Sequence, residues 1–408
     1  MLRFKKIIEG LDVAFFLAIK NLLFKKKMLI MIVVIIGLGF LSTVFSTSVI
    51  MGLKFQVEDK AIDMMTGNIL IEPKSDEDYI QNVNEIEKKA LAIPGVVGIS
   101  PHINRGVILT DKYGTKAPTQ LKVIDPEKEA TASSLRENII SGSYLSKNTK
   151  GEILIGADIT KKYRMQEAFP AVDIDAGEKI MVTFDNGVTK QLKVRGIYGQ
   201  NFVATDFYVF ITKEEAKQVF NATDEEMNIA TEIMIKTKER GMEKAVIYKL
   251  KQFGITGRIW TWQEKLGVLS QFTDSMLIVS QLTGLIGIII AFATIYIMIY
   301  INVLHKRTQI GIMKAMGINK ETILTSYVIQ SFFYGVLGGT FGFILTKFII
   351  GYFTVNPIIM PIGEVVPIVE SSNYIISFSI LLASSLVAGF FPAQGAIKEN
   401  ILDAIFRG

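Results

Sequence analysis

Few residues in this chain have the types and spacing that catalysis or metal binding requires. The 408 residues include two histidines, His102 and His305, and no cysteine. The histidine spacing excludes an HExxH zinc motif, and the absence of cysteine excludes disulfides, thiolate metal sites and a cysteine nucleophile. The sequence also contains neither a GxSxG motif nor a GxxxxGK[ST] phosphate-binding loop. We therefore expect no enzymatic activity, no metal and no cofactor on this chain.

The segment with the most informative pattern is a short basic stretch at residues 305–321. It combines apolar residues at Ile310, Met313 and Met316 with basic residues at Lys306, Arg307, Lys314 and Lys320. Gly317 follows at a position typical of a helix C-terminus. The pattern predicts a short amphipathic helix with an apolar ridge, and an ordinary capped loop is the alternative.

Four apolar blocks surround this segment and predict membrane-spanning helices. They cover residues 28–49, 276–304, 322–350 and 374–391, contain no acidic residue, and have Lys347 as their single basic residue. About 20 apolar helical residues cross the hydrocarbon core, so each block can span a membrane. The spans leave residues 351–373 as an external loop. A chain with four apolar blocks of this length is not a purely soluble protein.

The distribution of charge predicts how the spans are oriented. Residues 1–27, 305–321 and 392–408 together carry 13 basic and 5 acidic residues, whereas residues 51–275 carry 30 basic and 32 acidic residues. The positive-inside rule therefore predicts an inner-membrane protein whose two termini and 305–321 segment lie in the cytoplasm. The net charge of +5 belongs to the membrane surface and does not indicate nucleic-acid binding.

The N-terminal segment, residues 1–27, predicts an amphipathic helix. Apolar residues recur at helical spacing from Phe4 to Leu22, with lysines on the other side. Such a helix fits the inner membrane surface, and a solvated lead-in to the first span is the alternative. The first span is too long for the apolar core of a signal peptide and predicts an uncleaved anchor.

Residues 50–275, between the first and second spans, predict a large α+β domain with a split core. Strands are expected at 67–72, 151–155, 179–184, 191–198, 207–211 and 232–236, with short strands between 96 and 122. Helices are expected at 76–91, 158–163, 213–220 and 242–253, and a hairpin turn at 185–187. Residues 49–65 and 262–304 predict helices that continue out of the first and second spans as stalks.

The third span contains two overlapping GxxxG pairs, formed by Gly335, Gly338, Gly339 and Gly342. Because glycine has no side chain, such pairs let a neighbouring helix approach closely. They predict helix packing, although glycine is also generally enriched in membrane helices.

Several motifs in order give the chain a family resemblance. The stretch RTQIGIMKAMG at 307–317 resembles the cytoplasmic coupling helix of ABC transporter permeases of the FtsX/MacB/LolC–LolE superfamily, whose usual form is close to RxEIGILKAxG. Similar matches occur at 142–145 (GSYL), 151–156 (GEILIG), 193–197 (KVRGI), 261–264 (TWQE), 391–393 (FPA) and 403–404 (DA). The order of one span, a large domain and three spans also matches. The TWQE segment and residues 123–127 lean toward the lipoprotein-releasing LolC/LolE branch.

The resemblance implies a non-catalytic permease whose outer domain is a MacB-like periplasmic core. A separate ABC ATPase, carrying ATP and Mg²⁺, would bind the coupling helix and drive mechanical transmission for lipoprotein release or export of a lipid-like substrate. The coupling residues would be Arg307, Gln309, Ile310, Gly311, Met313, Lys314, Met316 and Gly317. A second permease chain, membrane lipid and a periplasmic lipoprotein carrier or adaptor are the other implied partners.

Two departures and two alternatives remain open at this point. Gln309 occupies the motif's acidic position, so a hydrogen bond replaces a charge contact, and the tail lacks the family's second proline. A MacB-like efflux permease and an FtsX-like regulator of an extracytoplasmic partner are the alternative functions.

Overall fold

Four long helices contain the apolar blocks of the sequence in the computed structural model, which describes residues 2–24, 26–165, 167, 169–360 and 363–398. They are α2 (Lys26–Ala61), α8 (Gly267–His305), α10 (Lys320–Val355) and α11 (Ser371–Lys398). Each is long and apolar enough to cross a membrane. The predicted four-span architecture, with a large α+β domain between the first and second spans, is confirmed.

The chain divides into two compact units, and each is considered by itself. The helical unit comprises residues 1–53, 273–358 and 366–408, and the α+β domain comprises residues 54–272 and 359–365. The first span belongs to α2, which continues past the unit border after residue 53 into the α+β domain. The second span belongs to α8, which begins in the α+β domain and crosses the border after residue 272.

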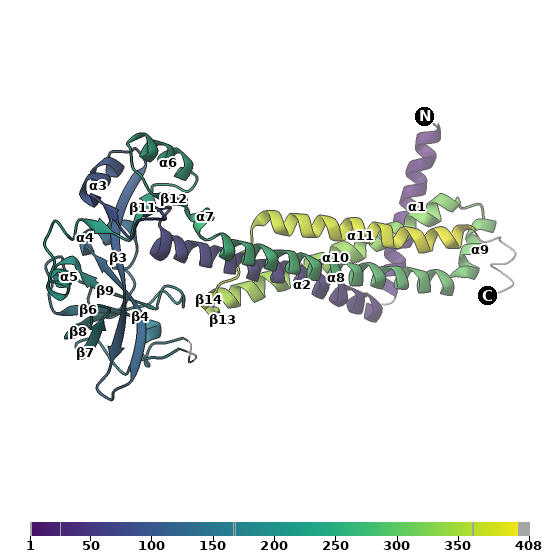
Figure 1. Ribbon diagram of the computed structural model, residues 1–408. Helices are drawn as coiled ribbons and strands as arrows, with labels where there is room; N and C mark the ends of the chain where they lie inside the picture. The colour runs from purple at the N-terminus through teal and green to yellow at the C-terminus, as the bar shows by residue number, and fades with distance from the viewer. Residues whose placement is uncertain (1, 25, 166, 168, 361–362, 399–408) are drawn as a thin grey trace. The chain divides into compact units, whose positions relative to one another are not determined.

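The helical unit is a bundle of the four long helices, joined by α1 (Leu2–Phe24) and α9 (Arg307–Ala315). Figure 1 shows α2, α8, α10 and α11 running side by side, with α1 crossing them and α9 at one end of the bundle. An apolar core runs along the bundle and includes Ile32, Ile36, Ile295, Ile299 and Tyr334.

The α+β domain is built on a ten-stranded sheet in the order β12-β1-β11-β3-β4-β9-β6-β8-β5, with β7 paired to both β3 and β8. The strands are β1 (Ile69–Glu72), β3 (Val96–Thr110), β4 (Lys116–Ile124), β5 (Ile139–Gly142), β6 (Glu152–Gly156), β7 (Lys179–Phe184), β8 (Thr189–Tyr198), β9 (Tyr208–Thr212), β11 (Glu232–Thr237) and β12 (Arg258–Thr261). Short pairs are β2 (Ile80–Gln81) with β10 (Ile229–Ala230), and β13 (Ile358–Met360) with β14 (Gly363–Val365).

The 15-residue strand β3 divides the sheet into two parts. Its first half pairs with β11 up to His102, and its second half pairs with β4 and β7. One apolar core lies under the β4–β9–β6–β8 part, and a second lies under β1 and β11 with two helices. The predicted split core is confirmed, and its cause is this change of partners along one strand.

Local sequence explains most of the shorter elements. In β7, Ile180, Val182 and Phe184 are buried while the residues between them are more exposed, and the β7–β8 hairpin turns at Gly187, whose φ is +81°. The helices are α3 (Val83–Leu91), α4 (Pro126–Ala132), α5 (Lys213–Phe220), α6 (Glu243–Gln252) and α7 (Trp262–Lys265), with a π-helical turn at Ile62–Thr66 and a 3₁₀ turn at Ala157–Ile159. Thr261 and Glu264 form a capping box at the start of α7.

Three predicted helices are wrong in extent. The 76–91 helix begins only at Val83, because Ile80 pairs in β2 and Asn82 takes a left-handed conformation with φ of 54°. The 158–163 helix is only a 3₁₀ turn, because Thr160 is extended and bridges Val172. The 262–304 helix is interrupted at Leu266, between α7 and α8.

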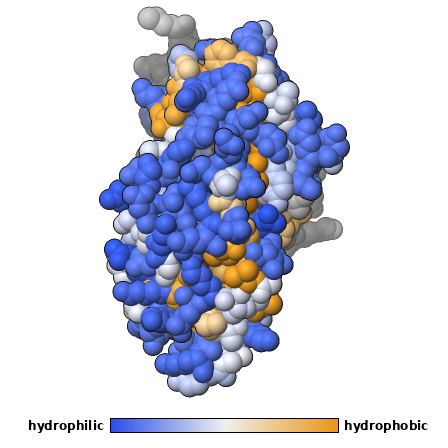
Figure 2. Space-filling view, turned by 60° about the vertical axis from the view of Figure 1, so that its left-hand side comes forward, coloured by the Kyte–Doolittle hydropathy of each residue, from blue (hydrophilic) through white to orange (hydrophobic). Residues whose placement is uncertain are grey.

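The face of the molecule in Figure 2, which brings the left side of Figure 1 forward, is mainly hydrophilic with scattered hydrophobic patches. This agrees with an α+β domain in water and contrasts with the long apolar helices.

Candidate functional site: the α9 helix and the cavity beside it

Helix α9 forms where the basic segment predicted a short amphipathic helix. Its C-terminus is closed by a Schellman arrangement, in which the N–H of Ile318 donates to Met313 O at 3.0 Å and the N–H of Gly317 donates to Lys314 O at 3.0 Å. Gly317 has φ of +87°, a conformation that glycine adopts without strain. The predicted helix end at Gly317 is confirmed.

The predicted apolar ridge of α9 is divided between two faces. Ile310 is 2% exposed and belongs to the core of the bundle, and Gly311 is buried next to it. Met313 is partly buried and packs against the same core. By contrast, Ile312 is 47% exposed and Met316 is 68% exposed. Because residues four apart share a helix face, Thr308, Ile312 and Met316 form one exposed row, with Gln309 exposed beside it.

Lys314 has a different environment from the one the ridge predicted. Its ammonium donates to the carbonyl oxygen of Ile397 in α11 at 3.0 Å, and the residue is only 9% exposed. The lysine therefore links α9 to the end of α11. Arg307 is the first residue of α9 and is partly exposed.

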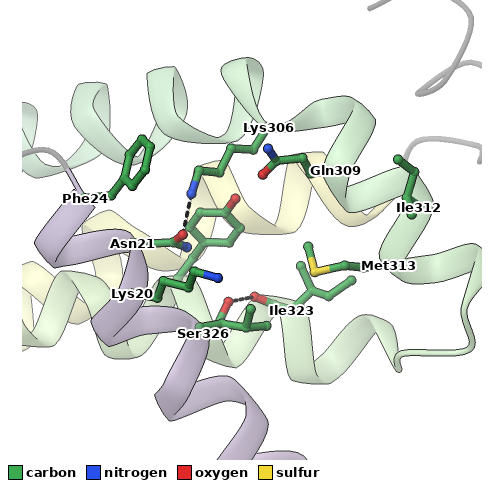
Figure 3. Close-up of a pocket in the computed structure, with 11 residues that line it drawn as sticks. Lys20, Asn21, Phe24, Lys306, Gln309, Ile312, Met313, Ile323 and Ser326 are labelled. Atoms are coloured by element: carbon green, nitrogen blue, oxygen red, sulfur yellow. Dashed lines mark hydrogen bonds between the residues drawn. The ribbon is translucent and has the colours of Figure 1, made fainter.

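A cavity of about 390 Å³ lies between α1, α9 and α10. Figure 3 shows Lys20 and Gln309 directed toward it from opposite sides and Met313 forming part of its wall. The ammonium of Lys306 donates to the side-chain carbonyl of Asn21 and so joins α1 to the start of α9. The lining residues are Leu17, Lys20, Asn21, Phe24, Lys306, Gln309, Ile312, Met313, Ile323, Ser326 and Tyr327. The cavity is thus largely apolar with two cationic groups and two amides.

Helix α1 is held against the bundle by one face. Ala14, Ala18 and Leu22, at helical spacing, are buried, and Phe15 packs against Phe333 of α10 with ring centroids 5.9 Å apart. On the other side, Phe24 is 79% exposed. This amphipathic character agrees with the prediction for the N-terminal segment, over the residues from 10 onward whose side chains are described.

The four glycines of the third span face two different helices. A Cβ at Gly338 would lie 2.5 Å from Ile36 of α2, and one at Gly342 would lie 2.7 Å from the carbonyl oxygen of Gly37. The other two meet α11, because a Cβ at Gly335 would lie 2.5 Å from the Ser385 hydroxyl and one at Gly339 would lie 2.6 Å from the Phe378 ring. Helix α10 therefore lies in close contact with α2 on one face and with α11 on the other.

Sequence reasoning missed a second close crossing, between α2 and α8. A Cβ at Gly39 would lie 3.0 Å from Gly287 O, and the Thr43 hydroxyl donates to Gly284 O at 3.2 Å. The hydroxyl of Ser280 lies 3.1 Å from that of Ser46. Glycines and small hydroxyl residues in both blocks were the available signal. Sequence reasoning also missed the contributions of Lys20 and Asn21 to the cavity, and only the helical pattern of the leader pointed there.

The histidines and acidic residues form no metal cluster within the described residues. His102 lies in a buried ionic network of the α+β domain, 2.7 Å from Glu129 and 3.1 Å from Glu232. Burial disfavours the charged form of His102, but the negative charge of Glu129 and the hydrogen bonds to Glu129 and Glu232 together outweigh it and raise the histidine pKa above 6.5. Lys122 completes the network, 2.8 Å from Glu232. These four groups neutralise one another where α4 packs on the sheet, which makes the network a structural feature.

Comparison with protein families matches both halves of the chain. Residues 28–253 match the MacB-like periplasmic core domain, and residues 282–401 match the FtsX-like permease C-terminal family. The described part of the second match contains α9, most of α8 and the two helices α10 and α11.

Individual relatives are distant. The chain is 22% identical to the lipoprotein-releasing system transmembrane protein LolC of Buchnera aphidicola over 80% of this chain and 79% of that protein. It is 28% identical to an uncharacterized ABC transporter permease of Methanocaldococcus jannaschii over 34% of this chain and 33% of that protein. It is 29% identical to the macrolide export ATP-binding/permease protein MacB of Campylobacter fetus over 26% of this chain and 16% of that protein.

Among solved structures, the periplasmic region of MacB from Actinobacillus actinomycetemcomitans covers 52% of this chain and 96% of its own, with 12% identity and a TM-score of 0.36. The extracellular domain of YknZ from Gram-positive bacteria covers 47% of this chain and 97% of its own, with 12% identity and a TM-score of 0.33. The family matches, together with the four spans and the inserted α+β domain, show that the chain belongs to the FtsX/MacB-like superfamily of ABC transporter permeases, as a multi-pass, non-catalytic membrane subunit.

Proposed function

We propose that this permease receives ATP-driven motion from a separate ABC ATPase at α9 and transmits it to its α+β domain, in order to release lipoproteins or export a lipid-like substrate. The observation that carries the proposal is the exposed row on α9, which includes Ile312 and Met316. An apolar row on a short helix between two spans requires a covering surface, and a groove on a partner protein is a common one.

The cavity beside α9 supports the same contact. Gln309, Ile312 and Met313 line it from α9, while Lys20 and Asn21 line it from α1. A partner side chain that enters between α1 and α9 would contact apolar walls and two lysines, so the ATPase is expected to present an uncharged hydrogen-bond acceptor, such as an amide carbonyl, there. Coupling through Arg307, Gln309, Ile310, Gly311, Met313, Lys314, Met316 and Gly317 is then divided. The exposed members meet the partner, and the buried members transfer its movement to α8, α10 and α11.

Continuity of helices supports transmission to the domain. Helix α2 passes from the helical unit into the α+β domain at residue 53, and α8 does so near residue 272. A helix with an unbroken hydrogen-bond ladder conveys a displacement along its axis more directly than a flexible linker does.

The charge split supports an orientation with α9 and both termini in the cytoplasm and the α+β domain outside. Reporter fusions test this orientation. A fusion after residue 408 should report a cytoplasmic location and one near Lys150 an external location, and the opposite pair of results would refute it.

The substrate class rests on the likeness to LolC, the transmembrane protein of a lipoprotein-releasing system. We infer a second permease chain, identical or paralogous, and a lipoprotein carrier or adaptor outside the membrane. Export in the manner of MacB is the second candidate, supported by the MacB-like domain match; regulation in the manner of FtsX is the third.

Co-purification followed by reconstitution tests the proposal. The tagged permease should retain an ABC ATPase in detergent, and the complex in liposomes should release a fluorescent acylated lipoprotein to a soluble acceptor only when ATP is present. Retention without release, combined with ATP-dependent efflux of a small amphiphile, would favour the second candidate. If no ATPase is retained, the proposal is refuted.

A further inference from the structure

One loop of the α+β domain contacts both α2 and the connector between α10 and α11. This loop, residues 199–207, joins β8 to β9 and is called the β8–β9 loop below. Lys60 of α2 and residues 359–360 and 363–365 of the connector belong to the same compact unit as the loop. The loop is therefore the place where two separate membrane-derived segments reach the sheet.

The first contact is made by Asp63, in the π-helical turn that follows α2. Its carboxylate accepts hydrogen bonds from the backbone N–H of Ser134 at 3.0 and 3.1 Å and from the side-chain amide of Gln200 at 3.0 Å. The Ser134 hydroxyl also donates to it, and Lys236 lies 3.6 Å away. A π turn redirects side chains at the end of an α-helix and is frequent at functional positions. One carboxylate thus connects the end of α2 to three separate parts of the domain.

The second contact is made by Lys60, one turn earlier on α2. Its ammonium donates to the carbonyl oxygens of Gln200 and, at 3.3 Å, of Asn201. Lys60 and Asp63 therefore both hold Gln200 from one helix end, and Lys60 holds Asn201 as well.

The third contact comes from the connector between α10 and α11. Gly363 bridges Phe202 in antiparallel fashion, and the Asn201 side chain donates to Glu364 at 3.0 Å. Gly363 has φ of +144°, and a Cβ there would lie 2.3 Å from Asn201 O, so the position requires glycine. Asn201 itself has φ of +55°, which a non-glycine residue adopts at some cost.

The loop is also braced from inside. The Asp206 carboxylate accepts from the backbone N–H of Gln200 at 3.0 Å and of Phe202 at 3.4 Å, and the Tyr198 hydroxyl donates to Thr205 O at 2.8 Å. Both Asp206 and Tyr198 are buried. A loop with these internal hydrogen bonds moves as a rigid unit, so a displacement of the loop is transmitted to β8 and β9.

We propose that the β8–β9 loop is the joint through which movement of α2 and of the α10–α11 connector enters the sheet, with Asp63 as the positioning residue that fixes the joint to α2. This proposal rests on the proposed function, because it assigns a route to the motion that the ATPase supplies at α9. Asp63 acts through Ser134 and Gln200 and contacts no substrate.

The test compares Asp63→Asn with Asp59→Asn in the full permease–ATPase complex. Asp59 lies one turn earlier on α2 and pairs with Arg240 at 2.7 Å with 59% of its side chain exposed, so its replacement removes the same charge outside the joint. Two quantities are measured: substrate released per ATP hydrolysed, and the nucleotide-dependent change in hydrogen exchange at residues 199–207. With Asp63→Asn the released amount per ATP should fall about fivefold or more, the lower range of coupling between sites. The nucleotide response should vanish at 199–207 and persist at α9.

Exchanging the donor and the acceptor between residues 63 and 200 distinguishes loss of the hydrogen bond from simple loss of folding. Gln200→Glu alone places two carboxylates together and should uncouple in the same way, whereas Asp63→Asn with Gln200→Glu reverses the hydrogen bond and should restore part of the coupling. A purely structural role for Asp63 would raise hydrogen exchange throughout the domain without nucleotide, and would show no rescue.

The outcomes separate the two proposals. If the wild-type chain retains no ATPase, the proposed function fails and the joint fails with it. If the wild-type complex responds to nucleotide and Asp63→Asn responds equally, or if Asp59→Asn is equally impaired, the joint alone is refuted.

Discussion

Replacement of Ile312 by glutamate is the sharpest perturbation of the contact proposed for α9. Ile312 is 47% exposed in the isolated chain, so a partner could bury about half of a side chain whose full burial contributes about 1.5–3 kcal/mol. A carboxylate in the same place loses that term and adds the cost of an unpaired buried polar group, about 1–3 kcal/mol. The sum, about 2–4 kcal/mol, corresponds to a Kd for the ATPase raised about 30-fold or more.

The assay is binding of the purified ATPase to permease immobilised in nanodiscs, followed by nucleotide hydrolysis of the complex. Gln309→Glu is the matched control, because it adds the same charge to the same helix, at an exposed position beside the lysines of the cavity. That variant should bind as well as the wild type or better, since it restores the acidic residue of the related motif.

The result that would refute the reasoning is equal loss of affinity in both variants, which would indicate a general charge effect. Unchanged affinity in Ile312→Glu would refute it as well. Met313→Glu is a less selective probe, because Met313 packs against the bundle core and its replacement also disturbs the fold.

Three further predictions concern the bundle and the domain. Gly338→Leu should overpack the α2–α10 contact and cost about 1–3 kcal/mol in detergent unfolding, whereas Gly351→Leu, on the same helix with open space around it, should cost little; equal effects would contradict the close packing. Burial opposes ionisation of Glu129, but the charge of His102 and the hydrogen bonds from His102 and Ser133 together prevail and lower the glutamate pKa from 4.5 to about 2. The stability that ionised Glu129 gives the domain is therefore complete above pH 4.5 and lost as pH falls toward 2. Glu129→Gln should destabilise the domain by about 3–5 kcal/mol at pH 6 and weaken this acid dependence. Hydrogen exchange of β3 and β4 measures both effects. Thermal unfolding of the chain should be unchanged by chelator and by reductant, because the sequence has no cysteine; a large fall with chelator would reveal a metal.

The membrane helices and most strands could be predicted because their signals are local. Apolar blocks without acidic residues predicted all four long helices, and alternation predicted β7. The 76–91 helix failed because Ile80 pairs with a strand some 150 residues away, a contact that no local pattern contains. The sequence predicts short strands between 96 and 122, whereas β3 runs unbroken from Val96 to Thr110, because it changes its pairing partner from β11 to β4 along its length.

The candidate site was predictable in position but not in orientation. Residue types located the helix and its glycine end, while the face that meets the bundle depends on where α11 and α1 lie. For that reason Lys314, expected at a docking surface, instead bonds to Ile397. The joint at Asp63 gave no sequence signal, since an aspartate near the end of an apolar helix resembles any solvated residue. The predicted tail beyond Lys398, with its motif at 403–404, lies outside the described residues.

Site-specific crosslinking from α9 tests most directly whether the ATPase contacts this helix. The chain has no cysteine, so a single cysteine at Met316 carries a photoreactive probe without a mutated background. Illumination of the permease–ATPase complex should give a covalent permease–ATPase product from Met316→Cys, and none from Tyr113→Cys, an exposed position in the α+β domain. Absence of the product at Met316, or equal yields from the two positions, would contradict the proposal that ATP-driven motion enters the permease at α9.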